Sequence, residues 1–109
     1  MGLPNFSFTK LSKSQMHIGV CVIDLAIHGN NSLKEKRRVI KSVKDRVRNK
    51  FNVSIAEIDN LELHQLGTIG IVCISNSNRQ VNSVLSKIVD FIDEMRIAEI
   101  RQYWIEMVW

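Results

Sequence analysis

The chain has 109 residues, 45% of them hydrophobic and 24% charged, with a formal net charge of +4; these values are typical of one globular domain and exclude a largely disordered chain. Its longest apolar runs, IGVCVI and IGIVCI, are far shorter than the roughly 18 residues that cross a bilayer, and no basic segment precedes an apolar one near the start, so we expect a cytoplasmic protein without membrane contact. The two cysteines, Cys21 and Cys73, lie inside these apolar runs, which favours reduced core thiols over a disulfide scaffold.

The first 15 residues contain the only proline of the chain and show neither helical nor strand periodicity. Terminal segments of this kind are usually loose. We therefore predict a flexible N-terminal extension over residues 1–15 and a single domain over residues 16–109.

Four strands are predicted, over residues 16–28, 53–59, 66–75 and 98–109. The first and third are apolar on both alternating sets of residues, which is typical of strands in the middle of a sheet. The second and fourth alternate polar and apolar residues, as half-exposed strands do.

Two helices are predicted from capping boxes that precede apolar stripes. Ser32 with Glu35 places the start of the first helix at Leu33, and Ser77 with Gln80 opens the second. Asn52 is expected to end the first helix in a left-handed conformation. The first stripe contains Leu33, Ile40, Val43, Val47 and Phe51, with Val39 at its margin, and the second contains Val81, Val84, Leu85, Ile88, Val89, Ile92 and Met95.

The element order β-α-β-β-α-β, with right-handed crossovers, predicts a ferredoxin-like α+β sandwich. The expected sheet is antiparallel and four-stranded, in the order 4-1-3-2, with both helices on one face. The predicted helix–sheet core consists of Leu33, Ile40, Val43, Val47, Val84, Leu85, Ile88 and Ile92.

The first strand is apolar on both faces, although helices cover only one face of such a sheet. A second copy of the chain is the simplest cover, which predicts a homodimer through the open sheet face or an edge strand. The alternative cover is the N-terminal extension, whose apolar side chains are Leu3, Phe6, Phe8 and Leu11.

Positive charge is concentrated in residues 32–51, which hold nine Lys or Arg and two acids, a net charge of +7 that leaves −3 for the rest of the chain. A face built only for solubility usually mixes both signs, because like-charged neighbours cost helix stability. The missing acids favour a nucleic-acid interface. An acidic protein partner remains an alternative, as does plain solvation with Asp45 pairing Lys41 and Arg48. The candidate nucleic-acid-binding residues, which form one arc of the helix, are Lys34, Arg37, Arg38, Lys41, Lys44 and Arg48.

No pattern typical of a catalytic, metal or cofactor site is present, so we expect no enzyme activity, no metal and no cofactor. The histidines His17, His28 and His64 are scattered, and no Cys-x-x-Cys, P-loop or nucleophile motif occurs. Asp24 lies in an apolar strand, and Glu57 and Asp59 are predicted on one side of the second strand. Without partner groups, these acids are better explained as bonded to neighbours or water.

The stretches SLKEKRRVIKSVKDRVRNKFNVSIAEID and LGTIGIVCISNSNRQV resemble the bacterial YlxP-like family of domains of unknown function, over residues 16–109. This resemblance implies a small ferredoxin-like domain with no established activity, encoded in a gene cluster with translation factors. At residues 62–65 this chain has ELHQ where relatives carry a DLWQ-like segment with a tryptophan.

Together these features predict a non-enzymatic accessory factor that binds ribosomal or structured RNA. The alternative is a homo-oligomeric interaction module, or a small-ligand regulatory domain, with an acidic partner.

Overall fold

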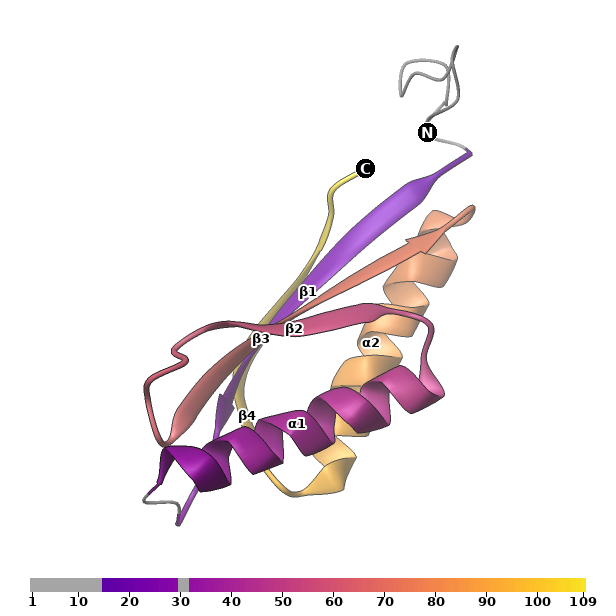
Figure 1. Cartoon of the computed structure of the whole chain (residues 1–109). Helices are drawn as coiled ribbons and strands as arrows, with labels where there is room; N and C mark the ends of the chain where they lie inside the picture. The colour runs from indigo at the N-terminus through magenta and orange to yellow at the C-terminus, as the bar shows by residue number, and fades with distance from the viewer. Residues whose placement is uncertain (1–14, 30–31) are drawn as a thin grey trace, which may run out of the picture.

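The computed structural model describes residues 15–29 and 32–109 of the chain, and Figure 1 shows its six elements. The predicted extension, residues 1–15, lies outside this part apart from Gln15. The elements are β1 (His17–Ala26), α1 (Leu33–Lys50), β2 (Ser54–Asp59), β3 (Leu66–Ser75), α2 (Asn78–Met95) and β4 (Glu99–Met107).

The four strands form one antiparallel sheet in the order β2-β3-β1-β4, which is the predicted order read from the opposite edge. β1 and β3 pair along ten residues, from His17 opposite Ser75 to Ala26 opposite Leu66. Their central position confirms the interpretation of the two continuously apolar runs, because both of their edges are occupied by neighbouring strands.

Both helices cover the same face of the sheet, as predicted, and two glycines mark where they approach it most closely. A Cβ placed on Gly19 in β1 would lie 2.6 Å from Val81 of α2, and one on Gly67 in β3 would lie 2.9 Å from Ile40 of α1. Gly19 is registered with Cys73, and residues 67 and 73 point to the same side because side chains alternate along a strand. No helix of the described residues therefore lies on the opposite face, as Figure 1 also shows.

The hydrophobic core lies between the helices and this face. Of the predicted core residues, Ile40, Val43, Val47, Leu85, Ile88 and Ile92 are buried and Val84 packs against them half-buried. Leu33 is half-buried and lies outside the core cluster. It belongs to the first turn of α1.

Serine hydroxyls begin both helices, as the capping boxes predicted. The Ser32 hydroxyl accepts a hydrogen bond from the Glu35 amide at 3.1 Å, and that of Ser77 accepts from the Gln80 amide at 3.2 Å. The predicted left-handed stop at Asn52 is wrong. α1 instead ends at Phe51, whose backbone is extended. The Phe51 amide still donates to the Val47 carbonyl at 2.8 Å, and its ring packs on Phe91.

The two cysteine thiols lie inside the core, and burial raises the pKa of the Cys21 thiol from 9.0 to about 11. Only the thiolate reacts with alkylating agents. We expect the folded protein to resist iodoacetamide at pH 8. The Cys21 alkylation rate should be at least about a hundredfold below that in urea, because the raised pKa alone lowers the thiolate fraction by about that factor. Peptide mass spectrometry of both states measures this rate. Rapid labelling of Cys21 in the native state would contradict the burial.

Within the part of the chain that the structure describes, neither helix is long and apolar enough to cross a membrane.

Candidate nucleic-acid interface

Helix α1 lies on the sheet with its outer side in solvent, and its residues divide sharply between the two sides. Ile40, Val43 and Val47 face the core and are buried. Five of the six predicted contact residues are exposed, and Lys44 is half-exposed. The six are Lys34, Arg37, Arg38, Lys41, Lys44 and Arg48. The structure therefore brings all of the predicted residues to one outer surface, which we call the α1 basic surface.

Three of these six side chains form ion pairs with acids of the same helix. Arg38 lies 3.2 Å from Glu35, and Asp45 lies 2.6 Å from Lys41 and 3.6 Å from Arg48. The hydrogen bond from Lys41 lowers the pKa of the Asp45 carboxyl. These pairs are solvent-exposed, so each stabilises the helix by only a few tenths of a kcal/mol. Arg48 also donates to the Ile55 carbonyl at 3.0 Å, which ties it to the neighbouring β2 strand.

The other three, Lys34, Arg37 and Lys44, make no ion pair with any of the described residues. Both acids of α1, Glu35 and Asp45, are already engaged by Arg38, Lys41 and Arg48. The exposed side of α2 carries a net charge of the opposite sign, since its three acids, Asp90, Asp93 and Glu94, outnumber its two cations, Arg79 and Lys87. The excess of positive charge thus belongs to one helix and not to the whole helical layer.

A seventh cation of α1, Lys36, is fully buried and is not among the predicted contact residues. Its ammonium lies 2.7 Å from the Glu57 carboxylate of β2 and donates to the carbonyls of Asn60 at 2.8 Å and Leu61 at 3.4 Å. A signal for this position exists in the sequence. Lys36 is four residues before Ile40 and seven before Val43, so a helical wheel places it in the middle of the apolar stripe.

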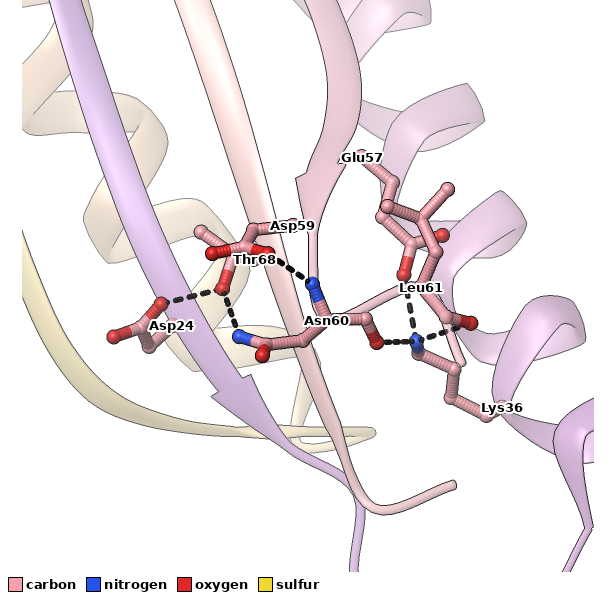
Figure 2. A network of polar contacts seen from close by, with 7 residues as sticks. All are labelled: Asp24, Lys36, Glu57, Asp59, Asn60, Leu61 and Thr68. Carbon is pink, nitrogen blue, oxygen red and sulfur yellow. Dashed lines mark hydrogen bonds and ion pairs between the residues drawn. The ribbon is translucent and has the colours of Figure 1, made fainter. Parts of the chain in front are cut away.

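Polar contacts continue from Lys36 around the end of the sheet to its open face, as Figure 2 shows. Asn60 adopts a left-handed conformation, with φ of 60°, and its side-chain amide donates to the Thr68 hydroxyl at 2.8 Å. Thr68 in turn donates to Asp24 at 2.7 Å, and Gln102 donates to the other oxygen of Asp24 at 2.6 Å. This network joins α1, all four strands and the β2–β3 connection, so it fixes where α1 sits on the sheet.

The prediction that Glu57 and Asp59 share one side of the second strand is wrong. The pairing of β2 with β3 shifts register between them, so Glu57 is opposite Ile69 while Asp59 is opposite Thr68, its immediate neighbour. Glu57 consequently faces the helices and Lys36, and Asp59 faces the open side, where its carboxylate accepts from the Asn60 amide at 2.8 Å. Consecutive β3 partners point to opposite sides, so the bulge separates the two acids.

The remaining titratable groups are spread over the fold. His28, after β1, lies 3.4 Å from Glu99 at the start of β4, and both side chains are exposed. His64 lies exposed in the connection between β2 and β3. Across residues 15–29 and 32–109, no three His, Cys, Asp or Glu side chains gather closely enough to hold a metal ion.

Comparison with known proteins gives the following similarities. The family described as "Protein of unknown function (DUF503)" matches residues 18–105. "Uncharacterized protein YlxP" of Bacillus subtilis (strain 168) is 42% identical over 76 residues, which are 70% of this chain and 83% of that protein. The de novo designed protein Foldit4 has a TM-score of 0.52 at 11% identity, covering 87% of this chain and 98% of its own. A dimeric ferredoxin-like protein from an uncultured marine organism has a TM-score of 0.43 at 9% identity, with 88% of this chain and 89% of its own covered. The likeness to Foldit4 shows the fold alone, and the last likeness is too distant to add to it.

Proposed function

The chain belongs to the DUF503 family of proteins of unknown function, as its sequence predicted, and we propose that it is a non-enzymatic cytoplasmic factor that binds ribosomal or structured RNA through the α1 basic surface. The observation that carries this proposal is the set of α1 cations that form no ion pair with any residue of 15–29 or 32–109. Lys34, Arg37 and Lys44 stand on an exposed helix side whose two acids are already paired.

A phosphate backbone is the partner that suits this surface. The helix has 18 residues and is therefore about 27 Å long, a length along which several backbone phosphates can be contacted. Each neutralised phosphate releases condensed counterions, so the affinity is expected to be strongly salt-dependent and largely independent of sequence. A flat row of cations on a rigid helix positions a protein on a backbone and reads no base edges.

Structured RNA is favoured over single-stranded sequence motifs because stacking side chains are missing from this surface. Sheets that bind single-stranded RNA use clustered exposed aromatic residues. In the described part of the chain the strongly exposed aromatic residues are Tyr103 and Trp104, which follow one another in β4 and so point to opposite sides of the sheet. Neither lies on α1.

The test is binding of the protein to ribosomes and to protein-free ribosomal RNA at graded salt. Replacing Lys34, Arg37 and Lys44 together with Gln is expected to lower affinity for RNA roughly tenfold or more at low salt. The slope of log K against log salt should become shallower by about two, because each phosphate contact contributes about 0.7–0.9 to that slope and up to three contacts are lost. Co-sedimentation and filter binding measure both quantities.

A matched control removes the same charge elsewhere. The triple replacement of Arg79, Lys87 and Arg96 with Gln takes three exposed cations from α2 and its C-terminal end and should change affinity by less than about twofold. Equal losses in both triple variants would mean that net charge and not the α1 surface drives binding. Binding to ribosomes without binding to free RNA would identify an acidic protein surface as the partner, and no binding to either at low salt would refute the proposal.

A further inference from the structure

We infer that the helix-free face of the sheet is the interface between two copies of this chain. Among the described residues, the large apolar side chains that are most exposed lie on this face, on β4 and its end, and in the β2–β3 connection. The eight residues are Ile58, Leu61, Leu63, Val72, Ile74, Tyr103, Trp104 and Val108. The inference stands independently of the proposed RNA binding, since it uses the opposite side of the molecule.

Strand register shows that the apolar residues of this face are contiguous. In β3, Ile69, Ile71 and Cys73 face the core, so the alternate residues Val72 and Ile74 point away from it, and they are 45% and 60% exposed. Val72 pairs with Val20 of β1, and Ile74 pairs with Ile18. Val22 pairs with Trp104 of β4, which is 47% exposed. These pairs form an unbroken apolar surface across three neighbouring strands.

Ile58 of β2 extends this surface onto the remaining strand of the sheet. Gly70 has no side chain, and a Cβ placed there would lie 3.1 Å from Ile58. The bulged Ile58 therefore folds over the gap that Gly70 leaves, while Ala56 is registered with Gly70. Apolar residues of this face thus extend from Trp104 of β4 to Ile58 of β2.

The charges at the margin of this face argue against a nucleic acid or an anionic membrane as the partner. Its charged residues are the acids Asp24, Asp59 and Glu106. The register places Asp24 and Asp59 on this side opposite Thr68, and Glu106 opposite Val20. The one cation beside them in the described residues is Arg101, which lies at the β4 bulge and 3.7 Å from Glu99. Phosphate-bearing partners require cations, whereas an apolar protein surface matches the centre of the face.

The area of the face suits a second copy. Strands of up to ten residues rise about 33 Å and four strands span about 19 Å, so each face covers roughly 500–600 Å². Two such faces together bury about 1,000–1,200 Å², near the lower limit of specific protein interfaces. A two-fold axis would stack the two sheets about 10 Å apart, so that the apolar residues of one copy's face cover those of the other copy's face.

A dimer through this face would place the two copies of α1 far from the interface. Because α1 and α2 lie on the other side of each sheet, the dimer would carry its two α1 basic surfaces on opposite outer sides. One dimer could then contact two separate segments of nucleic acid, which raises the effective affinity when both are within reach.

The experiment compares adjacent residues of β4 that are almost equally exposed but point to opposite sides. Light scattering of the full chain at tens of micromolar is expected to give a mass of about 25 kDa, twice the 12.5 kDa of the chain. Trp104→Glu and, separately, Val72→Glu should yield monomers, because each places a carboxylate in the apolar centre. Tyr103→Glu should remain dimeric, since Tyr103 pairs with Ile23 on the helix-bearing side.

A second measurement needs no substitution. Carbene footprinting of the native protein at low and high concentration should show protection of Trp104 and Ile74 on dimerisation and none of Tyr103. A monomer at all concentrations would overturn the inference, as would a dimer that survives both glutamates or one that Tyr103→Glu dissociates equally. If removal of residues 1–14 converts a monomeric full chain into a dimer, the extension and not a second copy covers the face, and the inference is likewise overturned.

Discussion

Replacing Lys36 with Met is expected to lower the free energy of unfolding by about 3–5 kcal/mol, although the substitution keeps the length of the side chain. The loss follows from what the ammonium leaves behind. The Glu57 side chain is only 14% exposed and its carboxylate loses its partner at 2.7 Å, and the carbonyls of Asn60 and Leu61 lose a donor. An unpaired, largely buried charge is the costly state, and Glu57 retains enough water contact to place the expected value toward the lower end of that range. Urea denaturation followed by circular dichroism measures it.

Two further variants separate the ion pair from general effects on the helix. Lys34→Met changes an exposed Lys two positions earlier and should alter stability by less than about 0.5 kcal/mol. The double variant Lys36→Met with Glu57→Leu removes both charges and should recover at least half of the loss, because a matched apolar pair carries no uncompensated charge. A cost below about 1 kcal/mol for Lys36→Met alone would show that the pair is not needed for the fold.

The same variant also separates the buried Lys36 from the cations that are proposed to contact RNA. Below its unfolding temperature, the Lys36→Met protein should keep its affinity for RNA, because the ammonium faces Glu57 and the backbone and not solvent. Amide exchange in the β2–β3 connection should accelerate, since Lys36 bonds two of its carbonyls. A large loss of RNA affinity in the folded variant would place Lys36 in the interface.

Replacing Gly19 with Val is expected to destabilise the protein by about 3 kcal/mol, at the upper end of the range for overpacking a core. Even the first carbon of a side chain at this position would lie 2.6 Å from Val81 and 3.1 Å from Leu85, both of which are fully buried. The helix would have to move away from the sheet to make room. Thermal unfolding measures the change, and a stability loss under 1 kcal/mol would show that α2 can shift freely.

The origin of this loss can be tested with a compensating change. Val81→Ala removes the closest atoms, so the double variant Gly19→Val with Val81→Ala should be more stable than the sum of the two single changes predicts, by at least about 1 kcal/mol. Gly70→Ala on the open face is the control. There a Cβ meets only Ile58, which is exposed and able to turn aside, so the change should cost less than about 0.5 kcal/mol.

Local sequence patterns were sufficient to predict the elements and their order. Ser32 and Ser77 begin helices because their hydroxyls accept from amides three residues on, a bond that depends only on neighbours in the chain. The central places of β1 and β3 follow from apolar residues on both sides of each strand, and the strand order follows from the handedness of crossovers. The α1 basic surface was likewise predictable, because residues at helical spacing share one side whatever the helix packs against.

Only tertiary structure could separate Lys36 from the other cations of α1. The helical wheel places it among apolar residues, but its burial requires a carboxylate to reach it from β2, 21 positions later in the chain. Glu57 lies on the same side of β2 as the buried Ile55 and so faces Lys36, whereas the bulge after Glu57 sends Asp59 to the other side. Asn60 bonds both Lys36 and Thr68 from a left-handed backbone conformation. At the end of α1, the Phe51 ring packs against Phe91 of α2 with the ring centroids 5.6 Å apart. The Lys36–Glu57 pair and the Phe51–Phe91 contact join residues far apart in the sequence, so periodicity and capping rules, which count near neighbours, carry no information about them.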